Sequence, residues 1–478
     1  MAKPQEKPDF PSLFPEVFVK EIPEELPPLR PILHRIILKD PTKLIKTPVL
    51  KCSDTLPGRF KDWIDKQMAA GILTRERAPA GASMFLQAKP DGRIRPLVDL
   101  QSRNQNTEGD HSQIPNQQTI LSAVAREKFR SKRDLSDAYF QTRVHPYDVK
   151  YNTIKTPFGS FTSEVMMQGD MNAPATLVRV MEDLFYKELG DYIWVYIDDI
   201  FIFSNIFKDH IQNVTTVCDK LRKAGFYTNP KKSMFFAEKL EILGNMIEDD
   251  GLHRAPERIR SIMDWTKPKN QKEVERFNVM VTYISQFLPH AATIKAPLTE
   301  LTGNTEWLCI DLHDAAFEAV KRAAENHQAL RPIDYTSPDM VWLFTDESPN
   351  GTGAWVGQGP TRDAARPAAF HSRKITPSQN AYPTHHQEAL AIVEPIASLE
   401  HLLRNRRFTV VTDHESLTKM MTQKGLSGRQ HRWLTFLSQF NLGIEYQSGV
   451  ENFLADYLSR IHERNLSSTD ITLRAPTL

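Results

Sequence analysis

The chain has 478 residues, of which 40% are hydrophobic and 25% charged, a composition typical of a soluble globular protein. This composition excludes a largely disordered or fibrous chain, and the length corresponds to about three domains. The formal net charge is only +1, so the chain as a whole lacks the basic signature common in nucleic-acid-binding proteins.

The charges are distributed unevenly along the chain. Residues 31–133 contain 19 Lys and Arg against 10 Asp and Glu, so the rest of the chain is acidic. A basic block favours nucleic-acid contact, although a solvated face is the commoner reason for a single charge cluster. Three widely spaced cysteines predict no zinc site and suit a reducing compartment. The polar, Pro-rich N-terminus predicts no secretion signal, and no apolar run approaches the ~18 residues that predict a membrane span.

The first half of the chain mixes helices with short strands. Residues 1–30 carry many prolines and acidic residues, which predicts an extended arm. Apolar spacing predicts a helix over 60–70, and residues 85–98 read as a β-hairpin with Pro, Asp and Gly at its turn. A second helix begins near Asn172, and Ser204 stands where it would cap a third.

The second half changes character twice. Residues 252–330 show helical apolar spacing without strand-like runs, which predicts a separate helical unit. After Arg331 the pattern mixes strands with helices and predicts an α/β unit. The expected strands cover 340–344, 408–411 and 442–446, and the expected helices cover 388–403 and 452–461. The residues after Arg464 are rich in Ser and Thr and predict a frayed tail.

Two adjacent carboxylates mark the turn of a further predicted hairpin over 192–203. Asp198 and Asp199 stand there between apolar strands, and Asp134 ends another β-rich run. A solvated turn is the commoner explanation for an isolated Asp-Asp pair, but the apolar flanks favour a core hairpin with a functional tip. Neighbouring carboxylates repel each other unless a cation neutralises them. Together with Asp134, the pair predicts a site for two Mg²⁺ ions about 3.5–4 Å apart and hence nucleotidyl transfer.

The order of these motifs, over residues 55–462, resembles the reverse transcriptase of Gypsy-type long-terminal-repeat retrotransposons. The resemblance implies that Asp134, Asp198 and Asp199 bind metal and are catalytic. It also implies contacts to the incoming nucleotide from the fingers hairpin, the steric gate, the nucleotide-positioning motif and a downstream lysine: Lys89, Arg95, Tyr139, Gln168 and Lys232. Contacts to the primer or template are implied for Gly169, Tyr196, Leu243 and Gly244.

A second set of carboxylates lies in the α/β unit. Two members end predicted strands and two lie on predicted helices: Asp346, Glu388, Asp413 and Asp456. Any one of them alone is more simply a capping or turn residue, but four such groups in one small domain can form a second two-metal site. Their order and context resemble a ribonuclease H (RNase H) domain, which implies that all four are catalytic metal ligands. We interpret the nearby histidines as structural, because Mg²⁺ rarely binds imidazole.

The resemblance implies an α/β and α+β multidomain fold, a right-hand polymerase followed by an RNase H-like α/β domain. We expect five segments: the arm over 1–30, fingers and palm over 31–251, a thumb over 252–330, an RNase H domain over 331–464, and a tail over 465–478. The expected activities are DNA synthesis on RNA and DNA templates and cleavage of the RNA in RNA–DNA hybrids. A domesticated, inactive relative that only binds nucleic acid is the main alternative, and a nuclease with a structural front half is another.

The expected cofactor is Mg²⁺, two ions in each active site, with Mn²⁺ as a substitute. The expected partners are an RNA template, a DNA primer, the RNA–DNA hybrid and dNTPs, without a membrane, and a homodimer is compatible with the resemblance. The same resemblance implies a retrotransposon particle in the cytoplasm, or the nucleus, as the location of the protein.

Overall fold

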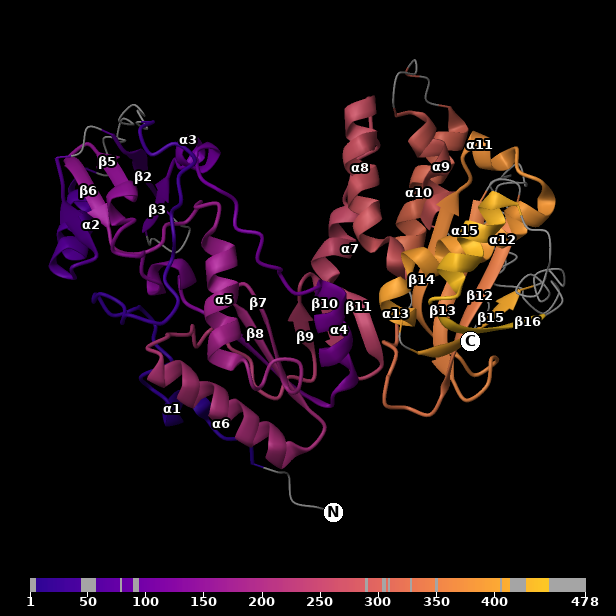
Figure 1. Cartoon of the computed structure of the whole chain (residues 1–478), viewed down its shortest axis with the longest axis horizontal. Coiled ribbons are helices and arrows are strands. Elements are labelled where there is room, and N and C mark those ends of the chain that lie inside the picture. Colours follow the sequence, from indigo (N-terminus) through magenta and orange to yellow (C-terminus); the bar gives the residue numbers. More distant parts are fainter. Residues whose placement is uncertain are drawn as a thin grey trace. The chain divides into compact units, whose positions relative to one another are not determined.

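The computed structural model divides into two compact units, Met1–Leu240 and Glu241–Leu478, which are described separately (Figure 1). It describes residues 6–43, 57–77, 80–88, 94–288, 291–302, 307, 310–326, 329–348, 351–404, 406–412 and 427–446. Among these residues, no helix is long and apolar enough to cross a membrane.

The first unit begins with a five-stranded sheet that corresponds to the fingers. Its strand order is β1-β6-β5-β2-β3, with bounds Leu73–Arg75, Gly159–Ser163, Thr153–Thr156, Ala82–Ala88 and Ile94–Val98. Helix α2 (Pro57–Ala69) packs on it through Phe60 and Ile64, which share a buried core with Leu73 and Phe161. The predicted helix over 60–70 is therefore confirmed. The predicted hairpin is confirmed as the antiparallel pair β2–β3, although its turn lies outside the described residues.

A three-stranded sheet forms the palm, in the order β4-β8-β7. Its strands are Phe129–Asp134, Asp199–Ser204 and Ile193–Tyr196. Helices α5 (Ala173–Phe185) and α6 (Phe207–Lys223) share one buried core with Ile193, Ile200 and Ile202 of this sheet. The hairpin predicted over 192–203 is confirmed. The cap predicted at Ser204 is wrong: strand β8 continues to that residue, and helix α6 begins only after Ile206.

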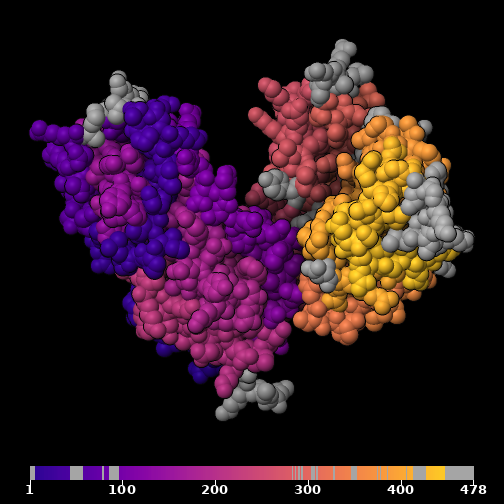
Figure 2. All heavy atoms as spheres, in the orientation of Figure 1, coloured from indigo at the N-terminus to yellow at the C-terminus, as the bar shows by residue number. Residues whose placement is uncertain are grey.

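The N-terminal arm contributes to the palm core, and Figure 2 shows indigo and magenta atoms together on the surface of this unit. Phe10 in the short helix α1 (Phe10–Leu13) and the following Phe14, Val17 and Phe18 are buried among palm residues. Phe18 also bridges to Thr228 in parallel. The aromatic residues of the arm therefore anchor this Pro-rich segment to the palm, because burial of their apolar area is favourable. The remaining elements of the first unit are α3 (Gln101–Gln105), α4 (Gln117–Arg126), η1 (Ala138–Gln141) and η2 (Val149–Tyr151).

The second unit opens with a small sheet, β9 (Leu240–Ile242), β10 (Asn245–Glu248) and β11 (Gly251–Arg254). The helices that correspond to the thumb follow and group together in Figure 1: α7 (Pro256–Met263), α8 (Gln271–Ile284), η3 (Ser285–Phe287), α9 (Ala291–Glu300) and α10 (Asp311–Glu325). Their core includes Ile262, Phe277, Leu298 and Phe317.

A five-stranded sheet forms the RNase H-like part, in the order β14-β13-β12-β15-β16. The bounds are Arg366–Lys374, Gly351–Gly359, Met340–Ser348, Arg407–Thr412 and Asn441–Tyr446. The first three strands are antiparallel, whereas β12, β15 and β16 are parallel. The helices are α11 (Pro377–Asn380), α12 (Thr384–Ser398), α13 (Glu400–Leu403) and α15 (Gly428–Leu437). The three predicted strands are confirmed, and the helix predicted over 452–461 lies outside the described residues.

Gly251 joins the hairpin β10–β11 to the segment that leads into the RNase H-like part. Leu252 and Leu330 exchange backbone hydrogen bonds of 2.8 and 3.0 Å. Gly251 has φ of +147°, and a Cβ atom there would lie 2.5 Å from the Leu330 carbonyl oxygen. Only glycine therefore permits this close approach of two backbones.

Gly251→Ala is expected to lower the unfolding temperature, because it adds a strained backbone and a clash with Leu330. A cost of roughly 1–3 kcal/mol corresponds to a drop of several degrees. Gly58→Ala in helix α2 is the matched control, because a Cβ there meets no atom within 4 Å. Thermal unfolding followed by circular dichroism measures both, and a Gly251→Ala protein as stable as the wild type would contradict this explanation.

Candidate active sites

The hairpin β7–β8 carries Asp198 at its turn and Asp199 at the start of its second strand. Tyr196 pairs with Asp199, so the turn consists of only two residues, Ile197 and Asp198. Ile197 has φ of +57°, which is a rare conformation for a β-branched residue. The strain costs roughly 1–3 kcal/mol and persists only where the surrounding structure imposes it. The buried residues of both strands supply that structure and point to a functional turn.

Asp134 lies beside this turn on the neighbouring strand. Strands β4 and β8 pair in antiparallel register with Asp134 opposite Asp199. Directly paired residues have Cβ atoms about 4.5–5.5 Å apart. The backbone N–H of Leu135 also donates a 3.0 Å hydrogen bond to the Asp198 carbonyl oxygen. The structure therefore brings together the three carboxylates predicted for the polymerase site.

Two lysines neutralise part of this charge. Lys232 places Nζ 3.2 Å from Oδ2 of Asp134, and Lys132 places Nζ 2.9 Å from Oδ2 of Asp199. The prediction named Lys232 alone. Lys132 was not predicted as a site residue. It precedes Asp134 by two residues, however, and this spacing places both side chains on one face of a strand.

Burial raises the pKa of Asp198, and the neighbouring Asp134 raises it further against the opposing lysines. Burial also raises the pKa of Asp199, while Lys132 lowers it in part. Ionised carboxylates in such surroundings need a cation, and hard oxygen donors suit Mg²⁺. The donor set therefore fits a divalent metal, although the oxygens of Asp134, Asp198 and Asp199 do not all lie within 4.8 Å of one another.

Tyr139 lies close to the same carboxylates. It belongs to the short helix η1, which follows Asp137 in the left-handed region with φ of +38°. Burial raises the pKa of the Tyr139 hydroxyl, and the charge of Asp198 adds to this effect. The predicted steric-gate residue thus lies within electrostatic range of Asp198.

Gln168 and Gly169 form a turn before helix α5. Gly169 has φ of +98°, and its carbonyl oxygen accepts a 2.9 Å hydrogen bond from Nδ2 of Asn104 in helix α3. Glycine is the residue that adopts this conformation without a steric penalty. The turn is therefore held by the helix that follows the fingers strand β3.

The other predicted nucleic-acid contacts are described only in part. Lys89 lies outside the described residues, and Arg95 is described as a member of β3, where its backbone pairs with Gln87. Tyr196 Oη accepts a 2.7 Å hydrogen bond from Nε2 of Gln117. The predicted primer-grip residues form the turn between β9 and β10. Both have positive φ, +52° at Leu243 and +75° at Gly244, as a two-residue type I′ hairpin turn requires.

Two members of the second carboxylate set, Asp346 and Glu388, lie in described elements of the RNase H-like part. Asp346 lies in β12, two residues after Phe344, which pairs with Val411 of the parallel strand β15. Glu388 lies in helix α12, whose Ala389 and Ile392 are buried against this sheet. Asp413 and Asp456 lie outside the described residues.

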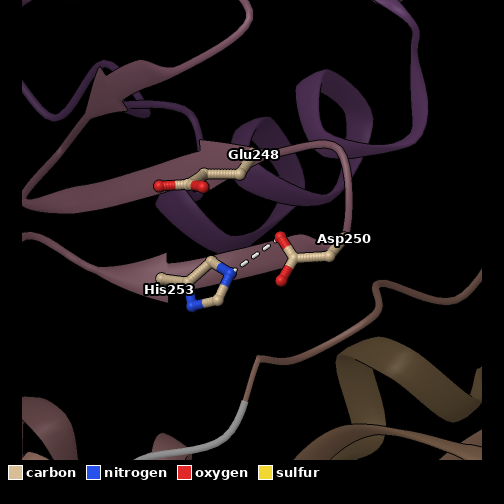
Figure 3. A group of neighbouring side chains, drawn as sticks. All are labelled: Glu248, Asp250 and His253. Carbon is tan, nitrogen blue, oxygen red and sulfur yellow. Dashed lines mark hydrogen bonds and ion pairs between the residues drawn. The ribbon is translucent and has the colours of Figure 1, made fainter.

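One further group of metal-binding side chain types lies on the hairpin β10–β11 (Figure 3). Glu248, Asp250 and His253 are the only described residues of which three donor atoms lie within 4.8 Å of one another. His253 Nε2 lies 2.9 Å from Oδ1 of Asp250, and this hydrogen bond lowers the pKa of Asp250. The group was not predicted from the sequence. Exposed acidic groups of this kind are common without an ion, so we assign it no role in catalysis.

Comparison with protein-family models identifies two domains. Residues 87–247 match the model of the reverse transcriptase, an RNA-dependent DNA polymerase. Residues 334–440 match the model of the RNase H-like domain found in reverse transcriptases. Proteins of these families depend on divalent metal ions.

The Tf2-3 and Tf2-7 transposon polyproteins of Schizosaccharomyces pombe are each 28% identical to the chain over 413 residues. These alignments cover 85% of this chain but only 31% of each polyprotein. The chain therefore spans about a third of the length of the curated relatives that it matches.

Solved structures show the same fold. The foamy viral protease-reverse transcriptase in complex with dsDNA has a TM-score of 0.81 at 19% identity, covering 92% of both chains. The same viral protein in complex with an RNA/DNA hybrid has a TM-score of 0.75 at 19% identity, covering 98% of this chain and 61% of that one. The right-hand fold with an RNase H-like domain is thus confirmed. The chain therefore carries a reverse transcriptase domain followed by an RNase H-like domain, and it is similar to the Tf2 transposon polyproteins over most of its length.

Proposed function

We propose that this chain copies RNA and DNA templates into DNA and cleaves the RNA strand of RNA–DNA hybrids. The observation that carries the proposal is the register of the palm sheet, which places Asp134 opposite Asp199 beside the strained turn of Asp198. The similar viral structures contain dsDNA and an RNA/DNA hybrid, which supports a template–primer as the partner.

The palm carboxylates would hold two Mg²⁺ ions, for which Mn²⁺ is a substitute. When bound, the metals supply a lowered pKa for the primer 3′-hydroxyl and compensate the charge that develops on the triphosphate. Lys232 lies on the exposed side of Asp134, and its side chain is 63% exposed. This lysine would offer a point charge to the triphosphate of a bound dNTP.

At the RNase H-like site, Asp346 and Glu388 come from a central strand and from the helix packed on it. Such an arrangement fixes carboxylates on rigid elements, which a two-metal hydrolysis requires. We propose that Asp413 and Asp456 complete this site. The substrate would be the RNA strand of the hybrid that the polymerase site produces.

Primer extension on an RNA template tests the proposal. We expect DNA synthesis that requires Mg²⁺ and dNTPs, together with cleavage of the copied RNA. Binding of the hybrid without incorporation or cleavage would instead support an inactive nucleic-acid-binding relative. Cleavage without incorporation would reduce the first unit to a structural role.

Tyr139→Ala is expected to increase the incorporation of ribonucleotides relative to deoxynucleotides. The charge of Asp198 acts on Tyr139, and we propose that the Tyr139 ring would block a ribose 2′-hydroxyl in a nucleotide bound beside that aspartate. Removal of the ring should change the sugar preference by roughly tenfold or more, as steric discrimination in a pocket permits. Single-nucleotide extension with rNTP and dNTP measures the ratio of kcat/KM for the two sugars. Tyr192→Ala, at the residue just before β7, is the control. An unchanged ratio in Tyr139→Ala would exclude the residue as the gate.

A further inference from the structure

A buried ionic cluster of Asp170, Arg103 and His34 adjoins the turn of Gln168 and Gly169, because Asp170 follows that turn in the chain. Asp170 Oδ2 accepts hydrogen bonds from His34 Nε2 at 2.9 Å and from Arg103 Nη2. Arg103 is 2% exposed, Asp170 is 6% exposed and His34 is fully buried. Charges are buried so completely only when they are paired and hydrogen-bonded, because desolvation is costly.

The cluster joins segments that are far apart in the sequence. Arg103 belongs to helix α3, which follows the fingers strand β3, and its Nη1 donates a 2.7 Å hydrogen bond to Oδ1 of Asn152. His34 belongs to the N-terminal segment, and its Nδ1 lies 2.9 Å from Oγ1 of Thr176 in helix α5. One carboxylate therefore connects the fingers, the N-terminal segment and the palm helix that begins after the turn.

Asp170 also shapes the turn itself. Its Oδ1 accepts a 3.1 Å hydrogen bond from the backbone N–H of Asn172, at the start of α5, and its N–H donates to the Met167 carbonyl oxygen at 3.3 Å. The neighbouring Asn104 holds the turn from α3 at Gly169 and at Met171. Both carboxylate oxygens of Asp170 thus accept hydrogen bonds. Oδ2 accepts them from the side chains of Arg103 and His34, and Oδ1 accepts one from the local backbone.

We propose that Asp170, held by Arg103 and His34, is a positioning residue that fixes the Gln168–Gly169 turn in its nucleotide-binding geometry. This inference rests on the proposed polymerase function. Apolar side chains in place of this cluster would be buried to a similar extent but would form no hydrogen bonds. Hydrogen-bonded polar groups in a core specify one arrangement of their neighbours. Loss of the carboxylate should therefore weaken dNTP binding more than it slows the chemical step.

Asp170→Asn is the first test, with Asp148→Asn as the matched control. Asp148 is also buried, and it pairs with Arg35, the chain neighbour of His34, at 2.6 Å but does not contact the turn. We expect Asp170→Asn to raise the KM for dNTP about tenfold while kcat changes less than about threefold, a binding-type effect. Asp148→Asn should lower the unfolding temperature about as much as Asp170→Asn does, but its KM for dNTP should equal that of the wild type.

The double variant Arg103→Leu/Asp170→Leu separates positioning from stability. Replacement of a buried ion pair by apolar residues of similar volume often restores or increases stability. We expect the double variant to regain the wild-type unfolding temperature while its KM for dNTP stays raised. A wild-type KM in Asp170→Asn or in the double variant, or an equal rise in Asp148→Asn, would overturn the proposal. A wild-type protein without DNA synthesis would instead refute the proposed function.

Discussion

Asp198→Asn is expected to abolish DNA synthesis while RNA cleavage in hybrids persists. The change removes a metal-ligating charge at the strained turn, and several kcal/mol of transition-state stabilisation correspond to a rate loss on the order of a thousandfold. Primer extension on an RNA template under single-turnover conditions measures the loss. Asp183→Asn on helix α5 is the control, because it removes an exposed carboxylate from the same unit.

The same variant should not destabilise the fold. Because burial raises the pKa of Asp198, the folded protein binds its proton more tightly than the unfolded chain does. The stability that this proton contributes is complete below the ordinary aspartate pKa of about 3.9 and is lost as the pH rises through the raised value. At neutral pH the wild type therefore carries the cost of a partly desolvated charge beside Asp134, and Asp198→Asn should unfold at the same or a higher temperature. A clearly lower unfolding temperature would contradict this account.

Asp346→Asn is expected to have the opposite selectivity, with RNA cleavage lost and DNA synthesis retained. The loss should again be on the order of a thousandfold, because the carboxylate is assigned to a two-metal site. A labelled RNA strand annealed to DNA reports cleavage, and primer extension on the same hybrid reports synthesis. Asp363→Asn is the control, since the Asp363 side chain is 84% exposed on the same domain. Equal loss of both activities in Asp346→Asn would contradict two independent sites.

Local patterns in the sequence predicted the elements that carry the carboxylates. The apolar runs on either side of Asp198 and Asp199 predicted a hairpin, and the structure contains it as β7–β8. The strands over 340–344 and 408–411 are likewise predicted, and the structure pairs them in parallel as β12 and β15. Such elements can be predicted because their signals, the spacing of apolar residues and the residue types at turns, lie within a few positions of one another in the sequence.

Contacts between distant segments were not predictable from these patterns. The Pro-rich arm gave no sign that Phe18 bridges to Thr228, more than 200 residues away in the chain. Asp170 stands in a motif otherwise read as a turn, and nothing local indicates its pairing with Arg103 and His34. Ser204 had the right residue type for a helix cap, but the pairing of β8 with β4 extends the strand to it. Tertiary pairing overrode the local preference in that case.

The net charge of +1 conceals an uneven distribution of charge along the chain. Basic residues concentrate in 31–133, whereas seven of the acids are assigned to two metal sites. A net charge summed over the whole chain therefore gives no argument against nucleic acid, because opposite local charges cancel in it.

The most direct measurement uses one RNA–DNA hybrid with a recessed primer and labels on both strands. Wild type, Asp198→Asn, Asp346→Asn and the double variant are compared with Mg²⁺ and dNTPs present. We expect both activities in the wild type, cleavage alone in Asp198→Asn, synthesis alone in Asp346→Asn and neither in the double variant. Synthesis that survives Asp198→Asn, or a wild type without incorporation, would contradict the proposed function.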